Sequence, residues 1–137
     1  MSYSLTWHVP KRVYICRIFG DVTVQDVSHM ARESLEYIRD GDAPVYVITD
    51  LRQMKKRPNN ISTLKDALAL FQEPNLGMIY LIHSDKLANF IATTMAQISR
   101  KELRAYRDPT RAIEVLQKFD PTLPTIPAYP SDYASTE

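Results

Sequence analysis

The chain has 137 residues, 45% of them hydrophobic and 24% charged, and carries a formal net charge of +1. These values are typical of a folded water-soluble domain and argue against disordered and membrane classes. The small net charge disfavours nucleic-acid binding, which depends on an excess of cations. No apolar run approaches the roughly 18 residues that cross a bilayer, and the first residues lack the features of a signal peptide, so we expect a cytoplasmic protein.

The first 20 residues predict two antiparallel strands. Apolar and polar residues alternate over 2–8, which indicates an edge strand with one buried face. Residues 13–19 are apolar except for Arg17 and predict a more central strand, ended by Gly20-Asp21. Cys16 is the only cysteine, so an internal disulfide is excluded, and its apolar surroundings predict a small buried side chain.

A helix is expected next. Thr23 and Asp26 have the spacing of a helix-capping pair, and Asp40-Gly41 provides a stop signal. Between these signals an apolar stripe recurs at helical spacing, formed by Val27, Met30, Ala31, Ser34, Leu35 and Ile38.

Two runs rich in apolar and β-branched residues, 45–49 and 76–82, predict strands covered on both faces. The segment between them predicts a helix that stops before Pro74, because the residue before a proline avoids the helical region. Its inward face is expected to carry Leu64, Ala67, Leu68 and Phe71.

The last part of the pattern contains two more helices and a short strand. A helix is expected after Ser84 or Asp85, and residues 102–107 predict a strand. Asp108-Pro109 has the form of an N-cap followed by a first-turn proline. We expect the final helix to bury Ala112, Ile113, Leu116 and Phe119.

The element order ββαβαβαβα predicts an α/β fold built on a mixed sheet of about five strands with flanking helices. We expect one domain over residues 1–119 and a proline-rich tail over residues 120–137. The tail carries Pro121, Pro124, Pro127 and Pro130, a spacing compatible with polyproline II. Two interpretations stay open: a disordered terminus, or packing along a groove of this or a neighbouring subunit through Leu123, Ile126, Tyr129 and Tyr133.

The element order, together with the stretches IFGDVTVQDV, VYVITDL and RAYRDPTRAIEVL, resembles the STAS superfamily (sulfate transporter and anti-sigma factor antagonist) and within it the SpoIIAA-like branch. The resemblance covers roughly residues 3–119 and implies a bacterial, regulatory, non-catalytic protein-interaction domain that needs no cofactor. Anti-sigma antagonists are similar in carrying a phosphorylated serine at the start of the second helix. That region here contains Ser62 and Thr63, and the family's usual Asp-Ser-Ser-Gly stretch aligns with Asn59-Asn60-Ile61-Ser62. A phosphoacceptor and a plain helix cap both remain open.

A cluster of cations precedes this helix, in a segment expected to be a loop. Its members are Arg52, Lys55, Lys56 and Arg57. Such a cluster could attract an acidic protein, a phosphate group or an anionic membrane surface, or could be an ordinary solvated loop.

Polar residues follow the predicted parallel strands, whose carboxyl ends share one edge of the sheet. They are Asp50, His83, Ser84 and Arg107. Asp50 and His83 could act as base and acid if they meet within hydrogen-bond reach. The structural alternative makes Asp50 a turn brace and Ser84 a helix cap.

The favoured function is a non-catalytic module that binds another protein, with self-association through helix faces or the tail as a further possibility. The chain lacks a glycine-rich phosphate loop, a nucleophile elbow and paired zinc-binding histidines, so no cofactor or metal is expected. A carrier of small apolar ligands is the alternative, with a pocket lined by Phe71, Phe90, Ile91 and Met95. A weak enzyme using Asp50 and His83 is third.

Overall fold

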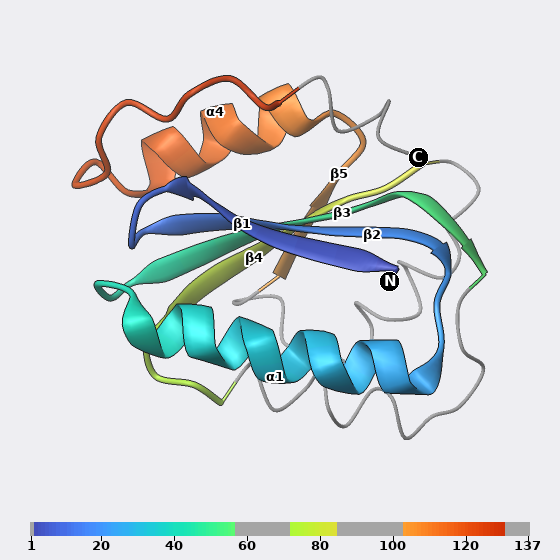
Figure 1. Ribbon diagram of the computed structural model, residues 1–137. Helices are drawn as coiled ribbons and strands as arrows, with labels where there is room; N and C mark the ends of the chain where they lie inside the picture. The colour runs from blue at the N-terminus through green and yellow to red at the C-terminus, as the bar shows by residue number, and fades with distance from the viewer. Residues whose placement is uncertain (1, 57–71, 85–102, 131–137) are drawn as a thin grey trace.

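Five strands form one mixed sheet in the order β1-β2-β3-β4-β5 (Figure 1). β1 and β2 pair antiparallel, and every later pairing is parallel. The strands are β1 (Tyr3–Val9), β2 (Val13–Asp21), β3 (Val45–Lys56), β4 (Leu76–Ile82) and β5 (Leu103–Tyr106). The predicted hairpin followed by parallel strands is confirmed. This computed structural model describes residues 2–56, 72–84 and 103–130, and the helices expected at 64–71 and after Ser84 lie outside those ranges.

Helix α1 (Val24–Asp40) covers one face of the sheet (Figure 1). The hydroxyl oxygen of Thr23 accepts a bond from the Asp26 amide at 3.1 Å, and the Asp26 carboxylate accepts one from the Thr23 amide at 3.0 Å. These reciprocal bonds satisfy two amides that the helix itself leaves unpaired, as the capping spacing predicted. The helix ends where the Gly41 amide donates to the carbonyl of Tyr37.

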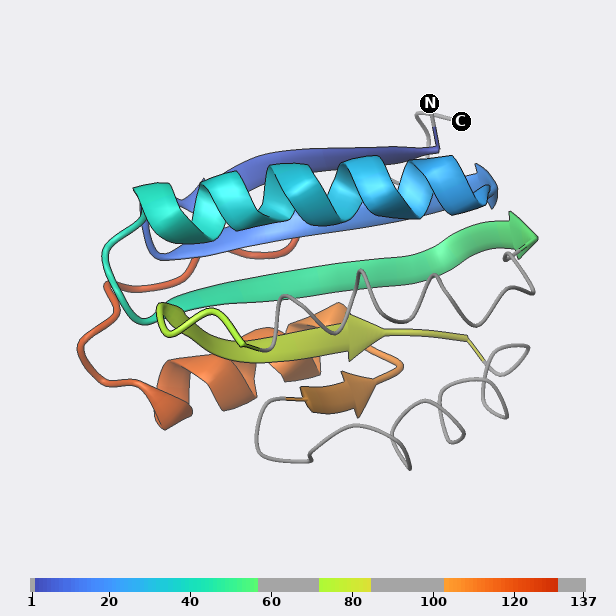
Figure 2. The same cartoon turned by 90° about the horizontal axis from the view of Figure 1, so that it is seen from below.

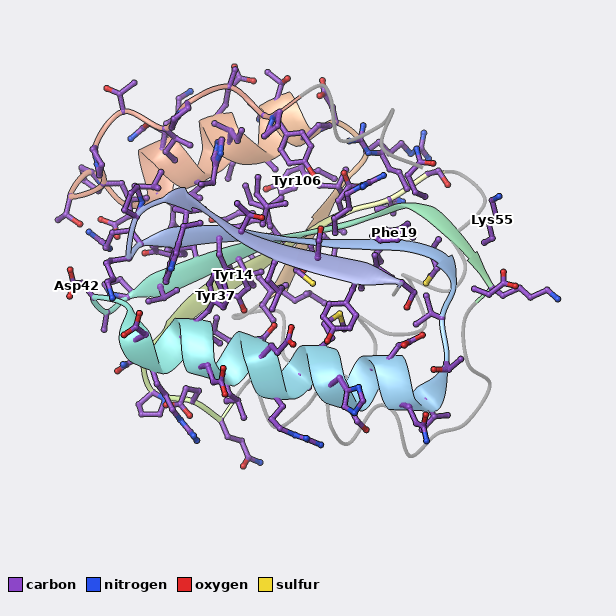
Figure 3. The ribbon with its side chains drawn as sticks, in the orientation of Figure 1. Tyr14, Phe19, Tyr37, Asp42, Lys55 and Tyr106 are labelled. Atoms are coloured by element: carbon purple, nitrogen blue, oxygen red, sulfur yellow. The ribbon has the colours of Figure 1, made fainter. Side chains whose placement is uncertain are left out.

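The core on the α1 side is built from alternate residues of the strands. The rings of Trp7, Tyr14 and Tyr37 contact one another, and the Tyr14 centroid lies 6.0 Å from that of Trp7 and 5.0 Å from that of Tyr37. Figure 3 shows Tyr14 and Tyr37 close together between the sheet and α1. Cys16 is buried in the same cluster, and burial raises the pKa of its thiol to about 12. The thiol therefore stays protonated at neutral pH and acts as a small apolar group, as predicted.

Helix α4 (Pro109–Phe119) covers part of the opposite face and begins at the predicted cap, where Asp108 accepts a bond from the Thr110 amide at 2.9 Å. Its inward residues Ala112, Ile113 and Leu116 are buried as expected. Phe119 is 53% exposed, so its predicted burial is wrong. Its ring centroid lies 6.2 Å from that of Tyr46 in an edge-on contact, and it is the next residue, Asp120, that is buried and accepts a bond from the Tyr46 hydroxyl.

Residues 120–130, called the strap below, run back over the same face of the sheet as α4 (Figure 1). Leu123 and Ile126 are buried, whereas Pro124 and Pro127 are exposed. This inward spacing of three fits a polyproline II segment with one buried edge. The strap packs on its own chain, and of the four residues considered for such packing only Tyr133 lies outside the described ranges.

β3 is longer than predicted. Its residues 52–56 continue the ladder with β2 as far as Lys56, although they were expected to form a loop. Pairing with β4 stops at Asp50, so β3 reaches beyond the end of β4 (Figure 2). β2 likewise continues through Gly20 and Asp21, which were expected to end it. The ladder to β2 pairs one side of the backbone of this polar segment, and two register shifts accommodate the extra residues of β3.

Candidate functional site at the carboxyl end of the sheet

The carboxyl ends of β2 to β5 lie along one edge of the sheet because these strands are parallel. The polar residues predicted to gather at this edge lie at different positions relative to the ends of their strands. Asp50 lies inside β3 and not at its end, because the strand continues for six more residues. His83 and Ser84 directly follow β4, and Arg107 directly follows β5.

The carboxylate of Asp50 is the centre of a compact polar cluster. Arg52 donates to both of its oxygens, with Nε 3.0 Å from Oδ1 and Nη2 2.8 Å from Oδ2. The Arg52 amide donates to Oδ1 at 3.0 Å. From the strap, the hydroxyl of Tyr129 donates to Oδ2 at 2.6 Å, and its ring centroid is 5.6 Å from the Arg52 guanidinium carbon.

This arrangement fixes the protonation states of the cluster. Asp50 is only 3% exposed, and burial alone would raise its pKa, but the hydrogen bonds and charge of Arg52 and the bond from Tyr129 hold the pKa below its ordinary value. Burial raises the pKa of Tyr129, and so does its bond to Asp50. At neutral pH the carboxylate is charged and the phenol protonated. A carboxylate that already accepts these bonds is a poor general base.

A second arginine lies buried next to this cluster. Arg17 is 4% exposed and pairs in register with Asp50 across β2 and β3. It follows Ile15 by two residues and so faces the side of the sheet that α4 and the strap cover. Its guanidinium carbon lies 4.9 Å from the ring centroid of Phe19. The sequence signal that could have identified Arg17 is its position inside an otherwise apolar strand, because a buried charge normally requires polar partners.

The structure brings Asp50 together with Arg52 and not with His83. The His83 amide donates to the carbonyl of Tyr106 at 3.0 Å, and its ring Nδ1 lies 3.2 Å from the carbonyl oxygen of Ser84. Within the described ranges, no hydrogen bond joins Asp50 to His83. The acid and base pair that the sequence suggested is therefore not assembled in this structure.

The basic residues divide into a bound one and two exposed ones. Arg52 is held by Asp50, with 35% of its side chain exposed, whereas Lys55 and Lys56 are exposed at the end of β3. Figure 3 shows Lys55 pointing away from the sheet. All three lie on a strand and not on the expected loop, because the ladder to β2 continues to Lys56. The other candidates, Arg57, Ser62 and Thr63, lie outside the described residues.

A separate polar cluster anchors the start of the strap. The Asp120 carboxylate accepts bonds from Arg12 Nη2 at 2.9 Å and from the Tyr46 hydroxyl at 2.8 Å. Burial would raise the pKa of Asp120, but bonds from Thr122 and Tyr46 and the charge of Arg12 hold it below its ordinary value. Sequence reasoning missed this cluster because its members lie far apart in the chain.

Neither metal binding nor membrane crossing has support in the part of the chain that the structure describes. Among those residues, no group of three histidine, cysteine, aspartate or glutamate side chains could hold a metal ion. None of the described helices is long and apolar enough to span a membrane.

Comparison with known proteins gives structural matches only: no protein-family model and no curated protein matches the sequence. An uncharacterised DUF3478-family protein from Shewanella loihica PV-4, with a SpoIIAA-like fold, aligns with a TM-score of 0.59 and 13% identity over 83% of this chain and 91% of that one. The Bacillus cell fate determinant SpoIIAA, in its phosphorylated form, aligns with a TM-score of 0.51 and 11% identity over 83% of this chain and 98% of that one. At 11% and 13% identity, these likenesses show the fold alone. The chain therefore has the SpoIIAA-like α/β fold of the STAS type that its sequence pattern predicted.

Proposed function

We propose that this protein is a non-catalytic protein-interaction module with a regulatory role, and that it binds an acidic partner through the basic tip of β3. The basic tip consists of Arg52, Lys55 and Lys56. The observation that carries the proposal is the contrast at the edge of the sheet: the buried Asp50 carboxylate is satisfied by Arg52 and Tyr129, whereas Lys55 and Lys56 face solvent.

The state of Asp50 supports a binding role over a catalytic one. A general base needs an accessible lone pair and a pKa near the working pH. Asp50 is buried, and its pKa is held low by donors that occupy both oxygens. The weak-enzyme alternative would require His83 and Asp50 to meet after a rearrangement that releases Arg52 and Tyr129.

The basic tip is suited to electrostatic recognition. Exposed cations on a short segment speed the encounter with an acidic partner and orient it, and salt screens this attraction. Affinity for the partner should therefore fall as salt is added. Ser62 and Thr63 follow Lys56 by six and seven residues in the sequence, and phosphorylation there would add negative charge to the same stretch of the chain.

The proposal is tested by affinity capture from a lysate of the native host. We expect the tagged full chain to retain a partner, and Lys55→Glu/Lys56→Glu to retain about one tenth as much, because the tip then repels acidic surfaces. The matched control is Arg111→Glu/Lys118→Glu, which reverses two exposed charges on α4. Equal retention by the tip variant and the control variant, or retention that added salt leaves unchanged, would contradict the proposal.

The carrier alternative stays a prediction. The four apolar residues suggested for its pocket, Phe71, Phe90, Ile91 and Met95, all lie outside the described residues. Self-association through helix faces or the strap also stays a prediction, as does a cytoplasmic location.

A further inference from the structure

β3 extends past the strand beside it. Pairing between β3 and β4 ends at Asp50 and Ile82, whereas pairing between β3 and β2 continues to Lys56 (Figure 2). Residues Leu51–Lys56, called the β3 edge below, thus have a paired side toward β2. Within the described ranges, no strand pairs with their other side.

The β3 edge is fixed to the body of the protein. Leu51 is buried, and Met54 packs against the core on the α1 side. Two register shifts against β2 lie in this segment, and such bulges are common next to functional sites, where they twist a strand and re-aim its side chains. The edge is therefore a positioned strand and can act as a template for another one.

Part of this edge is already satisfied by a side chain. The Asp50 carboxylate accepts the Arg52 amide at 3.0 Å, so one backbone donor of the β3 edge is bound by a side chain. Among the described residues, no strand partner is present for the backbone groups that face away from β2, and an unpaired edge of this kind is a site for strand pairing.

Charge selects the kind of strand that can join. Three cations, Arg52, Lys55 and Lys56, lie within five residues of the edge. Pairing with the same edge of a second copy would place like charges opposite one another, which is destabilising. An extended segment carrying glutamate or aspartate at alternate positions would place opposite charges across the pair.

We propose that the β3 edge binds an extended acidic segment of a partner protein by strand addition. Backbone hydrogen bonds to residues 51–56 would supply affinity, and Lys55 and Lys56 would select acidic side chains. This inference rests on the proposed function, for which it names the chemistry of the partner and the mode of its binding.

Two synthetic octapeptides with equal charge test this mode on the isotope-labelled full chain. The first alternates threonine with glutamate. The second alternates proline with glutamate and therefore has no amide protons at half of its positions. We expect the first to bind at least about tenfold more tightly and to slow amide exchange within residues 51–56. Lys55→Glu/Lys56→Glu should weaken binding of the first peptide about tenfold, and Arg111→Glu/Lys118→Glu should leave it unchanged.

The outcomes separate this inference from the proposed function. Equal binding of both peptides without amide protection would overturn strand addition and leave a basic docking surface in place. Failure of both peptides to bind would also overturn strand addition, while capture from lysate decides the proposed function independently. Capture that depends on the basic tip, together with amide protection by the first peptide alone, would support both.

Discussion

Two buried tyrosines on opposite faces of the sheet differ in one hydrogen bond. The Tyr46 hydroxyl donates to Asp120 at 2.8 Å. The Tyr14 hydroxyl has no hydrogen-bond partner in the part of the chain that the structure describes: Ser34 approaches it from α1 without meeting hydrogen-bond geometry. Burial raises the pKa of both phenols, so both stay protonated. The Tyr14 hydroxyl therefore incurs the cost of burial without the compensating bond.

We predict opposite effects of removing these two hydroxyls. Tyr14→Phe should leave the free energy of unfolding unchanged or raise it by up to about 1 kcal/mol, because an unsatisfied polar group is removed. Tyr46→Phe should lower it by about 1–2 kcal/mol, because Asp120 loses a donor. Urea unfolding followed by circular dichroism measures both. A loss above about 1 kcal/mol for Tyr14→Phe would show that its hydroxyl has a bound partner, such as an internal water.

Asp50 should make the free energy of unfolding depend on pH in the acid range. Its pKa is lower in the folded protein than in the unfolded chain, so its contribution is complete above the ordinary carboxyl pKa of about 4 and is lost as pH falls through the folded pKa. Asp50→Asn should cost about 2 kcal/mol at neutral pH and should flatten the fall in stability below about pH 4. Tyr129→Phe, which removes one donor, should give an intermediate slope. Urea unfolding at several pH values tests this, and parallel curves for wild type and Asp50→Asn would contradict it.

At the residue scale, whether a contact can be predicted from the sequence depends on how far apart its two residues lie in the chain. Thr23 and Asp26 are three residues apart, so their capping bonds follow from local spacing. Asp50 and Tyr129 are 79 residues apart, and their bond depends on how the strap crosses the sheet. No local pattern contains that information, so the sequence named both residues without connecting them.

At the scale of elements, apolar patterns predicted β4 and α4 well because burial imposes a period on their residues. The end of β3 lacked such a signal. Its residues 52–56 are polar or only partly buried, and they form a strand because β2 continues beside them. Pairing between strands is a tertiary effect that can override local preference.

Gly20 lets β2 continue along this extension. Its φ of +68° lies in the left-handed region, at the register shift next to Asp21. A Cβ added there would meet no atom within 4 Å, so the cost of a side chain is conformational and not steric. Gly20→Ala should therefore lower the free energy of unfolding by about 1 kcal/mol. Thermal unfolding tests this, with Thr6→Ala on the exposed face of β1 as control; equal melting temperatures for wild type and Gly20→Ala would contradict it.

At the scale of the whole molecule, the strap links the two polar clusters and completes the core. Asp120 holds its beginning against Arg12 and Tyr46, and Tyr129 holds its far end against Asp50. Between them, Gln117 accepts the Ile126 amide at 2.7 Å. The proline spacing predicted the conformation of this segment but not where it packs, because a polyproline II segment forms no internal hydrogen bonds and takes its place from the surface it meets.

Removal of the strap should therefore destabilise the entire fold. A chain that ends after Phe119 loses the burial of Leu123 and Ile126, worth about 2–3 kcal/mol each, together with the bonds that Asp120 and Tyr129 make to the sheet. Such a loss approaches the total stability of an ordinary domain, about 5–15 kcal/mol.

The matched control ends after Pro130 and keeps every strap contact described above. Urea unfolding of the two chains should place the shorter one at least about 4 kcal/mol below the longer one, or show no cooperative transition for it. Equal stability would mean that residues 120–130 lie on a core that is already complete without them. In that case the charges of Asp50, Arg17 and Arg52 would have to be satisfied without the Tyr129 hydroxyl.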